Sequence, residues 1–496
     1  MAIRSCSLVS ATLRGVSAIP VDVEVSVSSG LPGFTVVGMP DAAIQESRER
    51  VRAAIKSCGF EMPREKIVVN LAPGSLRKSG SGFDLPIALG ILLATSQLPH
   101  APFAKALVVG ELSLEGAVSS VPGLLSFQLC AKELGLDLLT GALVQGIFPL
   151  EGGRCLSVST LGGLRMGAVE EERSCFTAKN TSQVDFAQVR GQEFAKRALQ
   201  IAAVGDHGVL MVGPPGSGKT MLARCMAGIL PPLDERERIE AAQVHSVLNM
   251  SIENILAGQR PFRSPHHSAT AAGLVGGGTP VRPGEVSLAH HGVLFLDELP
   301  EFKPSVLQCL RQPLESGYVS ITRADGVYEL PANFALVAAM NPCPCGYYGD
   351  QEHECLCSES RIALYRNRIG GPLLDRIDVR IDVSRAAPES YFEAREGKST
   401  AELLEGVMEA REFKSWRNAR EGEQSSGGLD AILDRCKLSP ETRDSFIASV
   451  KGFKMSGRSV ARTLSLARTI ADMDQSSEVL FGHLAEAMTL RYDSQL

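Results

Sequence analysis

The sequence contains no hydrophobic segment long enough to cross a membrane. Its longest apolar run, Ile87 to Thr95, is far shorter than the roughly 20 residues that a membrane-spanning helix needs. The first residues, Met1 to Cys6, include no apolar core of a signal peptide, so nothing predicts export. We therefore expect a cytoplasmic protein that makes no contact with a membrane.

The sequence also lacks a strong charge of one sign. Its 496 residues carry a formal net charge of −6, which excludes a uniformly basic surface. Binding of nucleic acid stays open, because a ring can concentrate its arginines in a channel and remain acidic outside. With 44% apolar and 21% charged residues, the chain has the composition of a globular protein, and its length predicts about two to four domains.

The twelve cysteines lack the regular spacing of a disulfide framework, which favours a reducing compartment. Four of them form two close pairs, Cys343-Pro-Cys345 and Cys355-Leu-Cys357. Four thiols match the stoichiometry of a tetrahedral Zn²⁺ site, although one residue between ligands is fewer than structural zinc loops usually have. His353 could replace one sulfur. The alternative is a surface loop of reduced cysteines without a metal ion.

The pattern along the chain predicts three blocks. Residues 1–165 mix strand-like alternation, as in Val21 to Val27, with glycine-rich turns, and the charged, irregular stretch 166–184 indicates a linker. Residues 185–390 alternate strand and helix, which is typical of a parallel α/β sheet. Helical periodicity dominates residues 391–496. We expect an α/β protein with an N-terminal α+β domain, a central parallel sheet and a C-terminal helical lid.

The most informative motif follows the apolar run Gly208 to Val212, which predicts a buried strand. Glycines let the next loop bend tightly around a phosphate chain, with its backbone N–H groups pointing inward. The helix-like segment Met221 to Ala227 would place the positive end of a helix behind that loop. The motif predicts an ATP-binding phosphate loop formed by Gly213, Pro214, Pro215, Gly216, Ser217, Gly218, Lys219 and Thr220.

Five positions are predicted to supply the chemistry of hydrolysis. Lys219 would reach the β- and γ-phosphates, and the Thr220 hydroxyl would be a ligand of Mg²⁺. About 80 residues later, a second apolar run ends in Asp297 and Glu298. Asp297 is placed to hold Mg²⁺, usually through water, and Glu298 to polarise the attacking water. A third apolar run ends in Asn341, whose amide could hold the same water.

Three sequence segments resemble the AAA+ superfamily, and within it the branch of the Mg-chelatases and MCM helicases. They are Asp185-Phe-Ala-Gln-Val-Arg-Gly-Gln192, Arg260-Pro-Phe-Arg-Ser-Pro-His-His267 and Ala339-Met-Asn-Pro342. Together with Gly33-Phe-Thr-Val-Val-Gly-Met-Pro40, they resemble the bacterial ComM/YifB family over essentially the whole chain. That family is similar to hexameric ATP-dependent DNA motors. The resemblance implies a homo-hexameric ring that uses ATP and Mg²⁺ and moves single-stranded or branched DNA, as in natural transformation or recombination.

The resemblance also implies roles for individual residues. Those near the nucleotide are Gln192 on the adenine side, Asn341 as sensor 1, Arg376 as an arginine finger for a neighbouring subunit, and Arg462 as the sensor-2 arginine of the lid. A β-hairpin is expected just before sensor 1. The segment Val319 to Tyr328 fits, with a turn over Ala324 to Gly326 and the DNA-contacting Arg323 at its tip.

The N-terminal block, with a predicted helix from Ala42 to Ser57, resembles the Lon-protease-type domain, a fold shared with ribosomal protein S5. Such proteases need a nucleophilic serine and a lysine that activates it. Gly82 stands where the serine is expected, and Pro122 to Gln128 contains no lysine where the partner is expected. We expect the fold to be kept and the protease chemistry to be lost, with Ser81 and Lys78 as a residual alternative.

Three classes of function compete. A DNA motor is the leading prediction. The alternative is a Mg-chelatase-like ATPase subunit that drives metal insertion or protein remodelling, although the chain has no acidic-proline segment or integrin-like domain of the chelatase's partner subunit. A Lon-type protease is disfavoured by the missing serine and lysine. Stimulation of ATP hydrolysis by DNA would favour the motor.

Overall fold

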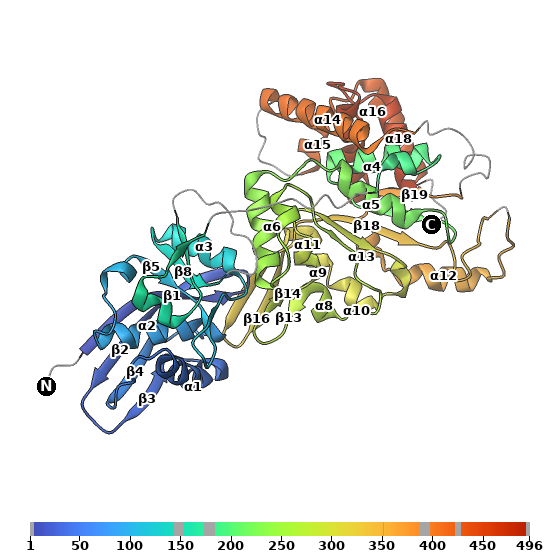
Figure 1. Ribbon diagram of the computed structural model, residues 1–496. Coiled ribbons are helices and arrows are strands. Elements are labelled where there is room, and N and C mark those ends of the chain that lie inside the picture. Colours follow the sequence, from blue (N-terminus) through green and yellow to red (C-terminus); the bar gives the residue numbers. More distant parts are fainter. Residues whose placement is uncertain are drawn as a thin grey trace.

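The computed structural model describes residues 4–142, 153–172, 184–350, 352–385, 397–421 and 428–492. These residues form an N-terminal α+β block, a central parallel sheet with helices on both faces, and a C-terminal helical lid (Figure 1). The α/β class and the order of the parts agree with the sequence-based prediction. Within the described ranges, no helix is both long enough and apolar enough to cross a membrane.

An eight-stranded mixed sheet, in the order β10-β9-β8-β5-β1-β2-β4-β3, forms the N-terminal block. The alternating valines predicted as a strand lie in β2 and are all buried, which explains their period of two. The predicted first helix is α1, which begins after its N-cap Asp41. The strands are β1 (Arg4–Arg14), β2 (Ser17–Ser28), β3 (Gly33–Val37), β4 (Lys66–Ala72), β5 (Ala106–Val108), β8 (Asp137–Gly141), β9 (Cys155–Val158) and β10 (Glu170–Glu171), and the helices are α1 (Ala42–Ser57), α2 (Asp84–Ala94) and α3 (Leu124–Glu133).

This block is longer than predicted. Strand β10 pairs with β9, so the sheet continues to Glu171, past the expected end at residue 165. The predicted linker 166–184 therefore begins too early, because two of its residues complete a sheet edge. Its central part, residues 173–183, lies outside the described residues.

The candidate serine and lysine of the N-terminal block do not form a catalytic pair. The Ser81 hydroxyl donates to Glu111 Oε2 at 2.8 Å. The Lys78 ammonium is fully buried and donates to three backbone carbonyl oxygens, those of Gly38, Leu71 and Pro73. An amine held this way stabilises the fold and is not placed to take a proton from Ser81. The contacts favour the expectation that protease chemistry is lost.

The central sheet consists of five parallel strands in the order β12-β15-β18-β11-β19. Alternate residues of each strand face opposite layers, and both layers are apolar, so the strands read as continuous hydrophobic runs. The strands are β11 (Val209–Val212), β12 (Phe262–Arg263), β15 (Val293–Leu296), β18 (Ala335–Met340) and β19 (Val379–Asp382). The helices are α4 (Glu193–Gly205), α5 (Lys219–Ile229), α6 (Glu235–Val247), α7 (Glu253–Leu256), α8 (Ala271–Val275), α9 (Glu285–Leu288), α10 (Pro304–Gln308), α11 (Arg311–Ser316), α12 (Glu359–Asn367) and α13 (Gly371–Leu374).

The N-terminal block is docked on the central domain through the turn between β1 and β2. Val16 in this turn is buried in the hydrophobic core on one face of the central sheet. Its carbonyl oxygen accepts hydrogen bonds from Ser126 Oγ at 2.6 Å and from Gln243 Nε2 at 3.0 Å. Helix α3 packs against α6 at the same junction, and Figure 1 shows the two parts side by side there. The N-terminal block and the central domain therefore share a buried interface.

The lid packs on the opposite face of the central sheet, over α4 and α5 (Figure 1). Its helices are α14 (Thr400–Glu421), α15 (Leu429–Cys436), α16 (Pro440–Gly452), α17 (Gly457–Met473) and α18 (Phe481–Tyr492). The Asp378 carboxylate connects the lid to the central sheet. Asp378 Oδ1, just before β19, accepts from Arg462 of α17 at 2.6 Å and from Arg491 of α18 at 3.2 Å, and Oδ2 lies 3.0 Å from His207 Nδ1.

Burial by itself would raise the pKa of Asp378, but the hydrogen bond and charge of His207, together with those of Arg462, outweigh it and lower the pKa. A lowered carboxyl pKa contributes stability that is present above the unfolded-state pKa of about 3.9 and lost as pH falls through the folded-state value. The Asp378 carboxylate is thus a charged joint between the sheet and two lid helices.

We expect Asp378→Ala to destabilise the lid by about 3–5 kcal/mol, because it leaves buried cations without their counter-charge. Urea unfolding followed by fluorescence of the single tryptophan, Trp416 of α14, reports on the lid directly. Asp375→Ala is the matched control, since this aspartate lies three residues away and is exposed, and it should change stability by no more than about 0.5 kcal/mol. Equal stabilities of the two variants would contradict the role of Asp378.

Candidate functional site

The predicted phosphate loop lies where a strand meets a helix. Strand β11 is entirely buried, the loop spans residues 213–218, and α5 begins at Lys219. Gly216 and Gly218 have φ angles of 78° and 89°, in the left-handed region that glycine tolerates best. A Cβ atom on Gly213 would lie 2.1 Å from the carbonyl oxygen of Val383, so the end of β19 also presses against this loop. The glycines of the motif are therefore required by the backbone.

The Lys219 side chain turns back over the loop and is almost completely buried. Its Nζ donates to the carbonyl oxygens of Gly213 at 2.7 Å and Pro214 at 2.9 Å. A third contact, at 3.3 Å, joins it to Oδ1 of Asn341 at the end of β18. Burial lowers the pKa of Lys219 to about 8, and the Asp297 carboxylate partly opposes this shift. The strand pairing thus brings the predicted phosphate-binding lysine and the predicted sensor together.

The two predicted Mg²⁺ ligands also meet. Thr220 Oγ1 donates to Asp297 Oδ2 at 3.1 Å, although the two residues are 77 positions apart. Hydroxyl and carboxylate oxygens are ligands that Mg²⁺ prefers, so this pair fits the ion at the edge of a phosphate loop. Since β18 lies between β11 and β15, Asp297 reaches the loop across one intervening strand.

Glu298 has a partner that the sequence-based interpretation did not assign. Its Oε2 lies 3.1 Å from Nδ1 of His267, in the loop after β12, and its backbone has a φ angle of 52°. From the sequence, the His266–His267 pair in a loop favours polar packing, with a catalytic or metal-binding role as the alternative. The parallel pairing of β12 with β15 is the signal that connects these segments, since both loops leave the same edge of the sheet. His267 therefore orients the candidate general base.

Gln192 lies on the same side of the sheet as the phosphate loop. It precedes α4, has a φ angle of 60°, and its side-chain amide donates to the carbonyl oxygen of Ser384, just after β19. The neighbouring Val383 contacts the phosphate loop through the close approach at Gly213. The placement is compatible with the predicted position beside the adenine.

The two predicted arginines lie at the other edge of the sheet. The N–H of Asp378 donates to the Gly208 carbonyl oxygen, so Arg376 and Asp378 stand at the amino ends of β19 and β11. The phosphate loop follows the carboxyl end of β11. Arg462 pairs with Asp378, and Arg376 forms an ion pair with Glu315. Burial lowers the pKa of Arg376, and the nearby charges of Arg311, Arg458 and Arg462 lower it further.

The predicted hairpin is present, with β16 (Tyr318–Arg323) paired antiparallel to β17 (Gly326–Pro331) and two residues in the turn. Arg323 is exposed beside that turn. A Cβ atom on Gly277 would lie 3.5 Å from Arg323 Nη2, so the guanidinium lies near the short hairpin of β13 (Gly276–Gly277) and β14 (Arg282–Pro283). Arg14 of the N-terminal block lies over the Tyr328 ring of β17 at 5.3 Å. The hairpin is therefore held between two domains, with its tip exposed.

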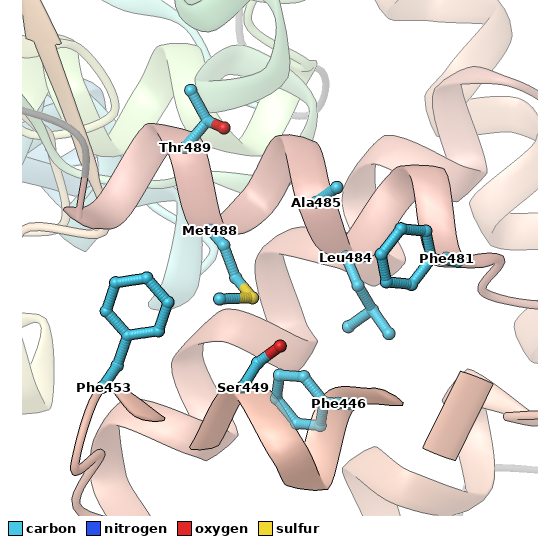
Figure 2. A pocket seen from close by; sticks show the side chains of 8 residues that line it. All are labelled: Phe446, Ser449, Phe453, Phe481, Leu484, Ala485, Met488 and Thr489. Carbon is cyan, nitrogen blue, oxygen red and sulfur yellow. The ribbon is translucent and has the colours of Figure 1, made fainter. Parts of the chain in front are cut away.

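An apolar pocket of about 310 Å³ lies within the lid, where side chains of α16 and α18 face each other (Figure 2). Its lining contains no charged side chain, so it offers no group for phosphate chemistry. The lining residues are Phe446, Ser449, Phe453, Phe481, Leu484, Ala485, Met488 and Thr489. The candidate reactive centre is the phosphate-loop edge of the sheet.

Comparison with known proteins gives matches along nearly the whole chain. Three family profiles match: "Magnesium chelatase, subunit ChlI" over residues 185–391, "Subunit ChlI of Mg-chelatase" over residues 23–140, and "Magnesium chelatase, subunit ChlI C-terminal" over residues 397–491. The second match lies within the N-terminal block, the first covers the central sheet, and the third covers the lid helices.

Two relatives match this chain over almost its whole length, and a third matches less than half of it. The chain is 40% identical to "Uncharacterized protein YifB" of Escherichia coli, with 96% of this chain and 95% of that protein covered. It is 39% identical to "Competence protein ComM" of Haemophilus influenzae, with the same two coverages. A "Magnesium-chelatase 67 kDa subunit" of Heliobacterium mobile is 28% identical over 42% of this chain and 35% of its own length.

The matches agree with the residues of the site. Family membership implies an ATPase that uses ATP and Mg²⁺, and the groups of the phosphate loop, Thr220 and Asp297 fit these two ligands. The chain belongs to the ComM/YifB family of Mg-chelatase-like AAA+ proteins.

Proposed function

We propose that this protein is an ATP-hydrolysing DNA motor that works as a homo-hexameric ring, as a helicase or branch-migration translocase. The observation that carries the proposal is the division of the hydrolysis machinery between two edges of one sheet. Lys219, Asp297 and Glu298 stand at the carboxyl edge, whereas Arg376 and Arg462 stand at the amino edge. Neighbouring copies in a ring would unite the two halves.

In this proposal each side chain has one task at the phosphates. Backbone N–H groups of the loop and Lys219 neutralise the phosphate charge, and Thr220 with Asp297 holds Mg²⁺. The ion shields the phosphate oxygens when bound. Glu298, oriented by His267, accepts the proton of the attacking water, and Asn341 hydrogen-bonds that water. Arg376 and Arg462 of the adjacent copy would stabilise the charge of the leaving phosphate.

DNA is the proposed partner for two reasons. The family resemblance implies a DNA motor, and one relative is named "Competence protein ComM". In this chain, the exposed Arg323 marks a hairpin that is anchored in the same core as β18, the strand that ends at Asn341. An arginine there can bind phosphate without reading bases. The four cysteines, whose donor set favours Zn²⁺, lie outside the reaction itself.

A Mg-chelatase-like subunit for metal insertion or protein remodelling is the second candidate function. The chelatase family profiles and the 28% identical chelatase subunit favour it. The deciding measurement is the rate of ATP hydrolysis with and without single-stranded and branched DNA. Stimulation supports the motor, and an unchanged rate together with no binding of DNA supports the chelatase-like function.

Glu298→Gln should bind ATP with normal affinity and hydrolyse it roughly 10²–10⁴-fold more slowly, because glutamine keeps the shape and a polar contact to His267 but is not a base. Phosphate release and nucleotide affinity measure the two effects separately. The matched control is Glu301→Gln, since Glu301 is a nearby carboxylate that pairs with Arg368 at the surface. Normal turnover by Glu298→Gln would show that another group is the base.

Mixing inactive Arg376→Ala protein with inactive Lys219→Ala protein should restore part of the activity, because mixed rings contain some interfaces with both intact halves. Loss of a finger costs roughly 10³–10⁵-fold in related phosphoryl-transfer enzymes, so the rescue is measured against a low background. A mixture of Lys219→Ala with Glu298→Gln is the control and should stay inactive, since both defects lie in the same half. Absence of rescue in mixtures shown to co-assemble would rule out a shared site.

Arg323→Ala should weaken DNA binding and strand movement, while hydrolysis without DNA is largely kept. Each lost phosphate contact lowers the slope of log affinity against log salt by about 0.7 to 0.9. Affinity for several DNA sequences at several salt concentrations tests both the loss and its independence of sequence. Arg52→Ala removes a partly exposed arginine of the N-terminal block and serves as the control. Equal affinities of wild type and Arg323→Ala would remove Arg323 from the mechanism.

A further inference from the structure

The four predicted cysteine ligands, 14 positions apart at the extremes, converge in the loop that follows Asn341. The Sγ atom of Cys343 lies 3.3 Å from that of Cys345 and 3.7 Å from that of Cys355. Cys345 and Cys355 are 3.6 Å apart, and all four Sγ atoms, including that of Cys357, lie within 4.8 Å of one another. The C-x-C spacing, which weakened the sequence-based prediction, therefore does not prevent convergence.

The separations fit a single metal ion. Zn–S bonds of about 2.3 Å in a tetrahedron place sulfur atoms about 3.8 Å apart. The space among these four sulfurs is too small for an iron–sulfur cluster, which needs room for several irons and sulfides. Soft thiolates in a tetrahedral set favour zinc over the harder cations Mg²⁺ and Ca²⁺. Cys343 is fully buried, and the other three thiols are half-buried, as in a closed structural site.

We propose that Cys343, Cys345, Cys355 and Cys357 bind one structural Zn²⁺ ion, and that this ion holds the loop that carries them (the cysteine loop) against the phosphate loop. Binding releases the remaining thiol protons to solvent and forms four Zn–S bonds without any change of oxidation state. The second half of the proposal, that the zinc ion supports ATP hydrolysis by positioning the phosphate loop, rests on the proposed function.

His353 does not belong to this site. Its ring stacks on Tyr347 at 4.8 Å, and its Nδ1 lies 3.2 Å from Arg385 Nη1. The ligand-forming atoms near His353 are those of Asp350 and Glu352, a separate group from the cysteines. Four sulfur ligands, and not three sulfurs with one nitrogen, are therefore the expected set.

A second group of metal-ligand types, Glu240 with His290 and His291, does not fit an ion. His290 Nδ1 accepts a hydrogen bond from the N–H of Asn333, so the ring carries its proton on Nε2, the atom that faces Glu240. A protonated nitrogen cannot ligate a metal. Burial lowers the pKa of His290 to about 4, in agreement with a neutral ring. The cysteines are the better metal site.

The cysteine loop touches the phosphate loop directly. A Cβ atom on Gly346, between the two cysteine pairs, would lie 2.8 Å from the Pro215 ring, so only glycine allows this approach. Arg385, after β19, joins the two loops from the side. It donates to Glu352 Oε2 at 3.2 Å and to the Pro215 carbonyl oxygen at 3.5 Å. Cys343 lies two residues after Asn341, so fixing this cysteine would also restrain the sensor residue.

Elemental analysis of full-length protein purified without chelator tests the metal. We expect about one zinc per chain in wild type and in the control Cys309→Ser, whose thiol lies outside the cluster and donates to the Ser305 carbonyl oxygen. Cys345→Ser and Cys355→Ser should lose most of it. Less than about 0.2 zinc per wild-type chain, iron in place of zinc, or equal zinc in Cys355→Ser and wild type would each overturn the site.

A measurement on wild type alone covers the case in which the variants do not fold. Titration with an organomercurial, which takes thiolates away from metals, should release the zinc to a chromogenic indicator. One zinc released as the four thiols of the loop react supports the site, whereas reaction of all thiols without released zinc contradicts it.

The effect of zinc on ATP hydrolysis is tested by removing zinc from the wild-type protein with a chelator and then restoring it. Hydrolysis should fall by about tenfold or more and recover with Zn²⁺, because a displacement of about 1 Å in a reacting group can cost 10²-fold. Unchanged hydrolysis after complete removal would overturn this second half of the proposal. Zinc content does not depend on DNA binding, so a failure of the motor proposal and a failure of the metal site give different results.

Discussion

The parallel pairing of β11 with β18 is the interaction on which the site depends. Val212 lies opposite Met340, and the N–H of Gly213 donates to the Met340 carbonyl oxygen at 3.2 Å, so both strands end at the same level. This register places Lys219 Nζ 3.3 Å from Asn341 Oδ1. Because β15 pairs with β18 on its other side, the carboxylates that follow β15 reach the same edge. A slip of one residue would point the apolar strand residues to the wrong layers.

The same strands also fix where the lid must lie. Their alternate residues form two separate apolar layers, one shared with α4, α5 and the lid, and the other shared with the hairpin β16–β17 and the turn at Val16. The lid can therefore not slide over the sheet without exposing its apolar side chains. Asp378 adds a charged contact at the amino edge. The arginines near Asp378 thus lie at the opposite end of the strands from the chain's own phosphate loop, which is the geometric basis for proposing a shared site in a ring.

The cysteine loop contacts the phosphate loop, and the N-terminal block contacts the hairpin β16–β17. The loop presses Gly346 against Pro215, and the β1–β2 turn places Arg14 on the hairpin that carries Arg323. The first contact joins the cysteine loop to the phosphate loop, which binds ATP in the proposed function. The second joins the N-terminal block to the hairpin that is proposed to bind DNA. In the N-terminal block, Lys78 is held by backbone carbonyl oxygens, so the contact that this block makes with the hairpin is structural.

The sequence by itself determined the local units. The order of strand, loop and helix around Lys219, the alternation of valines in β2, and the hairpin before Asn341 depend on neighbouring residues, and all three are found in the structure. Tertiary structure decided the contacts between distant segments. His267 meets Glu298 and Arg462 meets Asp378 because the strand order places their segments together, and the four sulfurs converge through the folding of the single loop that carries them. The physical reason is that local conformational preferences act over a few residues, whereas strand order is set by the burial of apolar layers contributed by the whole chain.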